Sequence, residues 1–344
     1  MAYASFLRST DFSRLKLKML ESLNVFHKKL FLVIAVIVTV VFCDLIQPTS
    51  GLFAMGRADK AVTESEQVLN THYSQSSNLP NPLRGVFLFS IEALEDAKST
   101  VENFTQLTAA LKKRKINFII FDMHWGTFKY ENTPGIKATS KRPIDKALAG
   151  KLSKIAKDAG MTVAVAVNFL THQSYGVLLK GYPEYAWIQK NGDTLAADPR
   201  TPKPNLWDPL NPGVNKIAFS MADELIDAFS PDVFHAGLDE LWGFDADNLK
   251  SNTEGLSTHQ LYAKIINQYH EHIVNTRGIP MMMWADSFEP LANRDKGLGA
   301  TAVLDMIPKD IILAYWHYGM ASKYPPMWTF AEKGFRVTAS PWND

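Results

Sequence analysis

Short, continuously apolar runs alternate with segments of helical periodicity from about residue 85 to the end of the chain. The runs cover residues 85–90, 117–122, 162–167, 232–237, 281–284, 311–316 and 335–340. Apolar residues follow one another in these runs instead of alternating with polar ones, which is typical of strands that are buried on both faces. The pattern therefore predicts seven parallel strands separated by helices.

Three of the four predicted helices carry a start or stop signal. We expect one from about Thr100 with a capping box at Ser99 and Glu102, one from Ile144 to a stop at Gly160, one from about Val214 to Phe229, and one from a capping box at Ser257 and Gln260 to Gly278.

This order of elements favours an α/β fold of the (β/α)8 TIM-barrel type over residues 83–344. The sequence ends at Asp344, directly after the seventh strand, so the eighth β/α unit is expected to be missing. We expect either a fragment of a longer barrel or an unusual mode of closure. The alternative is a doubly wound open sheet, but that fold usually has a glycine-rich phosphate loop after its first strand, and SIEALED (residues 90–96) follows here.

The first 82 residues have a different character. Residues 1–29 form a basic leader, residues 30–46 an apolar run that begins LFLVIAVIVTVVFC, and residues 47–82 a polar linker. Basic residues ahead of an uncharged run predict a signal peptide or an uncleaved membrane anchor, with the leader in the cytoplasm. The barrel would then be exported: secreted, periplasmic, or anchored on the non-cytoplasmic side of a membrane.

Composition narrows the chemistry further. The chain has 36 basic and 35 acidic residues, so its net charge of +1 provides no field that would attract nucleic acid. Its single cysteine, Cys43, lies in the apolar run, which leaves the barrel without disulfides or thiol chemistry. We expect neither a metal nor an organic cofactor, because the nearest candidate metal set, Asp122, His124, His235 and Asp286, lacks the spacing of a known motif.

Tryptophans gather just after the predicted strands, at the barrel end that carries the chemistry in this fold. They are Trp125, Trp242, Trp284, Trp316 and Trp342. Flat indole rings stack on the apolar face of a sugar, so such a group predicts a saccharide pocket. Polar residues, among them Asn168 and His172, follow the same strands.

Two adjacent carboxylates, Asp239 and Glu240, follow the fourth strand in the stretch FHAGLDELWG (residues 234–243). Neighbouring residues that leave a strand point in different directions, so the two can have separate tasks in one pocket. One can protonate a leaving oxygen while the other holds the substrate. The alternative interpretation is a solvated acidic loop.

HAGLDE (residues 235–240) resembles the H-x-G-G-D-E signature of family 20 glycoside hydrolases, the β-N-acetylhexosaminidases, with Leu238 at the second glycine. The segments around it occur in a similar order. LRG, KIN, VNFLTH and WDPLNP precede the signature, and MMMWAD, ILAYW and VTASP follow it. The similarity extends over most of residues 82–344.

The resemblance implies a (β/α)8 barrel that removes N-acetylglucosamine or N-acetylgalactosamine from β-glycosides with retention, the substrate's own acetamido group acting as nucleophile. It implies Glu240 as general acid and base, and Asp239 as the group that orients the acetamido nitrogen. The residues expected to bind the sugar are Arg84, His172, Trp242, Trp284, Asp286, Trp316 and Trp342. Asn168 stands where the family has an aspartate. The alternatives are a glycosidase for another sugar and a non-catalytic carbohydrate-binding barrel.

Overall fold

Seven parallel strands form one continuous sheet in the order β1-β2-β3-β6-β7-β8-β9. The computed structural model describes residues 78–89, 91–123, 126–173, 178–194, 196–198, 201–289, 298–318 and 324–341. The strands of the sheet are β1 (Gly85–Leu88), β2 (Phe118–Asp122), β3 (Thr162–Ala166), β6 (Val233–His235), β7 (Met281–Trp284), β8 (Ile312–Trp316) and β9 (Arg336–Ser340). All seven predicted strands are therefore confirmed, each within two residues of its expected bounds.

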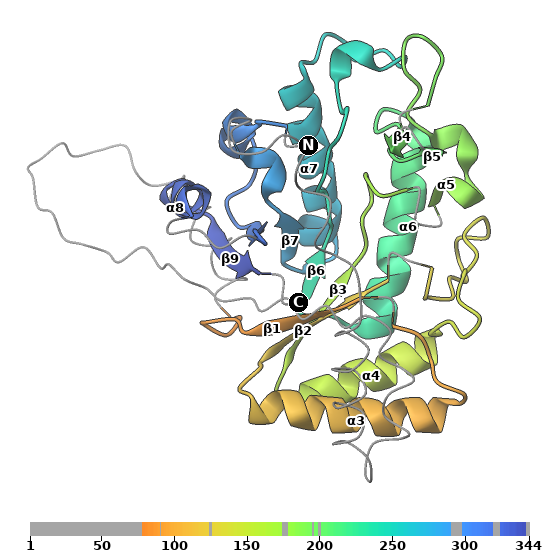
Figure 1. Cartoon of the computed structure of the whole chain (residues 1–344), viewed down its shortest axis with the longest axis vertical. Helices are drawn as coiled ribbons and strands as arrows, with labels where there is room; N and C mark the ends of the chain where they lie inside the picture. The colour runs from red at the N-terminus through yellow and green to blue at the C-terminus, as the bar shows by residue number, and fades with distance from the viewer. Residues whose placement is uncertain are drawn as a thin grey trace, which may run out of the picture. The chain divides into compact units, whose positions relative to one another are not determined.

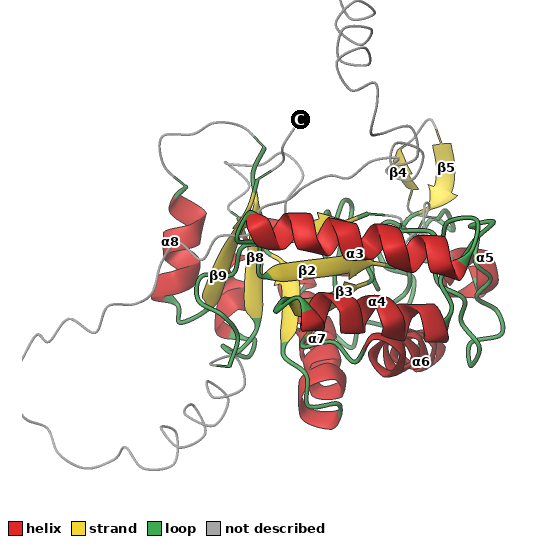
Figure 2. Ribbon diagram, turned by 90° about the horizontal axis from the view of Figure 1, so that it is seen from below, coloured by secondary structure: helices red, strands yellow, loops and turns green. Residues whose placement is uncertain are grey.

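The sheet curls so that the helices lie on its convex side (Figure 1). The long helices are α3 (Ala97–Lys113), α4 (Lys146–Asp158), α6 (Pro212–Phe229), α7 (Thr258–His270) and α8 (Pro325–Glu332). Figure 2 shows α3 and α4 running side by side along strand β2. This is an α/β fold with a half-barrel of seven parallel strands, in agreement with the predicted TIM barrel that lacks one unit.

Both faces of the sheet are buried, which explains why the strands are continuously apolar. One face packs against the helices through residues such as Phe121, Val165 and Phe234. The other face lines the inside of the curl and forms a second cluster. That inner cluster consists of Leu83, Phe87, Phe118, Ile120, Ala164, Ala166, Val233, Met282, Ile312 and Ala314.

The N-cap of α7 agrees with the prediction, whereas α3 and α4 begin at other residues than predicted. Ser257 and Gln260 form the predicted capping box of α7. The expected cap at Ser99 is wrong, because α3 begins earlier with Asp96 as its N-cap, whose carboxylate accepts a hydrogen bond from the Ser99 backbone N–H at 2.7 Å. Similarly, α4 begins at Lys146 instead of Ile144, since Asp145 caps it.

The connection from β3 to α6 is long and contains small elements that periodicity does not predict. These are α5 (Leu178–Gly181), the 3-10 helix Pro183–Tyr185, and an antiparallel hairpin of β4 (Ala196–Asp198) and β5 (Thr201–Pro204). Further short helices are Ala246–Asn248, Asp286–Phe288 and Thr301–Asp305, and a π-helical segment, Glu271–Thr276, extends α7 towards Gly278.

The predicted leader, apolar run and most of the linker lie outside the described residues, so these expectations remain predictions. Among the helices of the described ranges, none has both the length and the apolar character needed to cross a bilayer.

Candidate active site

A pocket of about 220 Å³ opens at the carboxyl ends of the strands. Its aromatic wall comes from β1, β7 and β8, and its polar wall comes from β2, β3 and β6. The described lining consists of Phe87, Phe89, Asp122, Ala166, Val167, Asn168, His172, His235, Gly237, Asp239, Glu240, Trp284, Trp316 and Tyr318. Both predicted carboxylates thus reach one cavity, together with two of the predicted tryptophans.

The loop that follows β6 holds the carboxylates through an unusual backbone. Gly237, Leu238 and Glu240 all have positive φ, of 72°, 68° and 52°. A Cβ at Gly237 would lie 2.7 Å from the Asn168 Cα, so glycine is required there for close approach as well as for φ. Leu238 has no such freedom and bears about 1–2 kcal/mol of backbone strain. Its fully buried side chain and the hydrogen bond from the Tyr262 hydroxyl to its carbonyl (3.0 Å) hold it in place.

Asp239 is held from three sides. Its carboxylate accepts hydrogen bonds from Asn168 Nδ2 at 2.6 Å and from His172 Nε2 at 3.1 Å. Its backbone carbonyl accepts one from the Thr171 hydroxyl at 2.6 Å. Burial favours the protonated acid, but the nearby His172 outweighs it and lowers the pKa of Asp239 below its ordinary value. Asp239 is therefore a fixed, ionised carboxylate.

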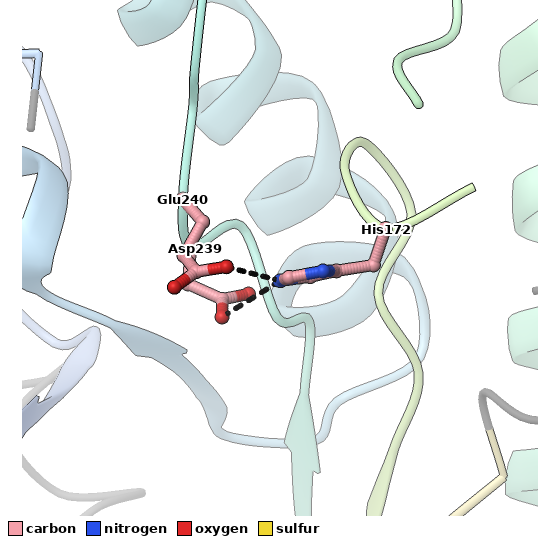
Figure 3. A group of neighbouring side chains, drawn as sticks. All are labelled: His172, Asp239 and Glu240. Carbon is pink, nitrogen blue, oxygen red and sulfur yellow. Dashed lines mark hydrogen bonds and ion pairs between the residues drawn. The ribbon is translucent and has the colours of Figure 1, made fainter. Parts of the chain in front are cut away.

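His172 faces both carboxylates from one side, with its Nε2 3.1 Å from Asp239 and 3.5 Å from Glu240 (Figure 3). Burial would lower the pKa of His172, but the attraction of Asp239, their hydrogen bond and the Glu240 carboxylate together raise it to about 9. At neutral pH the ring is therefore an imidazolium that neutralises part of the acidic cluster. The structure thus places His172, which we expected to bind the sugar, in the lining of the pocket.

Glu240 presents its side chain to the pocket and is 24% exposed, compared with 15% for Asp239. Its backbone N–H donates to Asp286 Oδ2 at 2.9 Å. Asp286 is buried, and it is not among the pocket's described lining residues. Asp286, which we expected to bind the sugar, accepts this hydrogen bond and so holds the backbone of Glu240 beside the pocket.

Two other residues that we expected to bind the sugar, Arg84 and Trp242, are not among the pocket's described lining residues. Arg84 precedes β1 and so lies at the opposite end of the strands, where its Nε donates to the Lys115 carbonyl at 2.9 Å. Trp242 lies in the turn after Glu240, and its backbone N–H donates to the Glu240 carbonyl at 2.7 Å. Its indole is absent from the described lining of the pocket. His124, Trp125 and Trp342 lie outside the described residues.

Sequence reasoning missed three aromatic residues of the pocket. Phe87 and Phe89 come from the first strand and its end, with ring centroids 4.6 Å apart. Their spacing of two residues places both on the inner face of the sheet, which is a signal that the sequence contains. Tyr318 stacks on Trp316 with a centroid distance of 4.7 Å and is 54% exposed at the pocket's rim. Tyr318 lies two residues beyond the end of β8, outside the apolar run from which we predicted that strand.

His172, Asp239 and Glu240 also form a group that could hold a metal ion, since one ligand atom of each lies within 4.8 Å of the others. A cation there would have to displace the proton from His172 Nε2, because a histidine binds metal only as the neutral ring. The proton that these carboxylates stabilise therefore competes with any metal.

Comparisons with known proteins agree with this geometry. The profile described as "Glycosyl hydrolase family 20, catalytic domain" matches residues 145–343. A comparison with curated protein sequences gave no match.

Among the solved structures that share the fold are two bacterial enzymes. A chitobiase from Flavobacterium johnsoniae is 19% identical with a TM-score of 0.51, over 75% of this chain and 38% of that one. A beta-N-acetylhexosaminidase from Bacteroides fragilis is 12% identical with a TM-score of 0.50, over 69% of this chain and 46% of that one. The chain thus corresponds to less than half the length of either protein.

Proposed function

Because this chain belongs to glycosyl hydrolase family 20, we propose that it removes terminal N-acetylhexosamine from β-glycosides with retention, using the substrate's acetamido oxygen as the nucleophile. The reaction breaks the bond between the anomeric carbon and the leaving oxygen. Glu240 gives its proton to that oxygen and then accepts one from the water that opens the cyclic intermediate.

The observation that carries this proposal is the unequal environment of the two adjacent carboxylates. Asp239 is ionised and has three hydrogen-bond partners, so it is poorly suited to attack carbon, while it can stabilise positive charge on an acetamido nitrogen. Glu240 has its backbone fixed by Asp286 and its side chain at the pocket. The structure thus supports one proton-transfer residue and one electrostatic residue.

The distance between these carboxylates also supports the proposal. One ligand oxygen of Asp239 lies within 4.8 Å of one of Glu240. An inverting pair needs roughly 6.5–9.5 Å to admit a water between them. The closer pair agrees better with retention than with inversion.

The aromatic wall supports a sugar as the ligand. Trp284 and Trp316 end neighbouring strands and line the pocket beside Phe87 and Phe89. Such a wall can cover the apolar face of a pyranose, while the opposite polar wall meets its hydroxyls.

The test compares an aryl β-N-acetylglucosaminide with the matched aryl β-glucoside, which lacks the acetamido group. We expect turnover of the first alone, and competitive inhibition by a thiazoline that mimics the cyclic intermediate. Equal turnover of both sugars with no thiazoline inhibition would favour a different sugar specificity. Sugar binding without turnover would favour a carbohydrate-binding barrel.

We further propose that the barrel acts outside the cytoplasm. The proposal is supported by the apolar run of residues 30–46 behind its basic leader. A fusion of residues 1–50 to a reporter that is active only after export should be active, and a cytoplasmic reporter signal would contradict the proposal.

A further inference from the structure

His235 is the last residue of β6, and its side chain lies on the inner face of the sheet, at the inner end of the pocket. Its Cα is paired with that of Ala166 on β3, which is paired in turn with Asp122 on β2. A small alanine thus separates a histidine from an aspartate in one row. All three residues line the pocket.

The hydrogen bonding of His235 fixes which ring nitrogen carries the proton. The Gly237 backbone N–H donates to His235 Nδ1 at 3.1 Å, so Nδ1 must have its lone pair free. Burial disfavours the charged ring and lowers the pKa of His235 to about 4, although Asp239 acts in the opposite direction. At neutral pH the ring is therefore neutral, and its single proton is on Nε2.

This Nε2–H donor has no hydrogen-bond acceptor among the described residues. The side chain is fully buried, and its ring packs against Trp284 and Phe87 at centroid distances of 4.5 and 6.0 Å. Those rings offer only weak acceptors for an N–H group. A buried donor without a partner is unfavourable, so an acceptor that enters the pocket would recover free energy.

We propose that His235 is a specificity-determining residue whose Nε2–H donates a hydrogen bond to a hydroxyl oxygen of the sugar in the pocket. This inference rests on the proposed function, since it names a contact with the same substrate. The neighbouring position of Asp122 strengthens it, because a sugar hydroxyl accepts from one partner and can donate to another. His235 thereby selects for a hydroxyl, and the apolar rings beside it exclude water from the contact.

The test combines a variant with a set of substrates. His235→Asn keeps an acceptor for the Gly237 N–H but removes the donor at the Nε2 position. The substrates are an aryl β-N-acetylglucosaminide and its 3-, 4- and 6-deoxy analogues. We expect the wild-type protein to lose about 10- to 100-fold in kcat/KM on one deoxy analogue, which corresponds to one buried hydrogen bond.

His235→Asn should lose a similar factor on the parent substrate and nothing more on that one analogue. His235→Gln, whose amide N–H reaches towards the Nε2 position, should recover part of the loss. An equal loss on all four substrates would show a purely structural role and overturn the proposal, as would wild-type activity in His235→Asn. Thermal unfolding of each variant verifies that it folds.

The same design separates this inference from the proposed function. If the wild-type protein turns over none of these substrates, the proposed hydrolysis fails. The hydroxyl contact is then tested by NMR titration of N-acetylglucosamine and its deoxy analogues into the wild-type protein and His235→Asn. A loss of affinity confined to one hydroxyl supports the contact, and equal binding of all the sugars by both proteins, or no binding at all, overturns it.

Discussion

Replacement of His172 by glutamine removes the imidazolium that pairs with Asp239. The pKa of His172 is raised from 6.5 to about 9, and its side chain is only 20% exposed. One pKa unit corresponds to about 1.4 kcal/mol, so the full effect is about 3 kcal/mol, of which about 2.5 kcal/mol is present at pH 7. We therefore expect His172→Gln to unfold with a free energy about 2.5 kcal/mol lower at that pH.

The pH dependence of this loss has a definite sign. A group whose folded-state pKa is raised stabilises the protein fully below its unfolded value, here 6.5, and that stability disappears as the pH rises through about 9. The pKa of Asp239 is lowered instead, so its contribution is present above its ordinary value of 3.8 and is lost as the pH falls. The pair of Asp239 and His172 therefore stabilises the protein most between about pH 3.8 and pH 6.5.

Urea unfolding at pH 7 and at pH 10 measures the effect. The difference between the wild-type protein and His172→Gln should shrink from about 2.5 kcal/mol at pH 7 to about 0.1 kcal/mol or less at pH 10. In an Asp239→Asn background the His172 substitution should cost much less even at pH 7, because the ion pair is already absent. A difference that is the same at both pH values, or unaffected by Asp239→Asn, would refute the assigned charge state.

Three further predictions concern the site. Asp286→Ala should lower kcat about 10- to 100-fold, because the Glu240 N–H loses its acceptor at 2.9 Å. Asp286→Asn keeps an acceptor oxygen, so its kcat should fall less. Equal losses of kcat in the two variants would contradict this role of Asp286. Gly237→Ala should destabilise the protein by about 1–3 kcal/mol more than Gly160→Ala. Both glycines have positive φ, but Gly160 has open space around it, whereas Gly237 contacts Asn168. Equal unfolding free energies of the two variants would show that the contact with Asn168 relaxes. Trp316→Ala should lower kcat/KM on the aryl glycoside about tenfold, whereas an alanine at the exposed Trp328 on α8 should not change it.

The strands and their order could be predicted because burial on both faces leaves a local record in the sequence. Inner positions such as Ile120 and Met282 are apolar because they pack inside the curl. Outer positions such as Phe121 are apolar because they pack against the helices. The first residues of the helices were harder to predict. Asp96 and Ser99 are both residue types that favour the N-cap, and the structure has Asp96 as the N-cap of α3. The small elements between β3 and α6 have too few residues to show a period.

The site was predicted less completely than the fold. A residue's position after a strand places it at one edge of the sheet, but it does not tell which way its side chain points. Glu240 and Asp286 both follow strands, yet one faces the pocket and the other supports its neighbour's backbone. Arg84 precedes its strand, and the rule that selected the tryptophans would have excluded it. His235 stands inside the signature, but only the hydrogen bond to Nδ1 shows that its other nitrogen is a donor.

The central claim is that Glu240 delivers a proton to the leaving group of an N-acetylhexosaminide. The most direct measurement compares Glu240→Gln with the wild-type protein on two substrates: one with a dinitrophenyl leaving group and one with a sugar leaving group. We predict a loss of about 10²- to 10⁴-fold in kcat on the sugar leaving group and a much smaller loss on the dinitrophenyl group, which departs without a proton. Equal losses on both substrates, or no loss on either, would contradict the account.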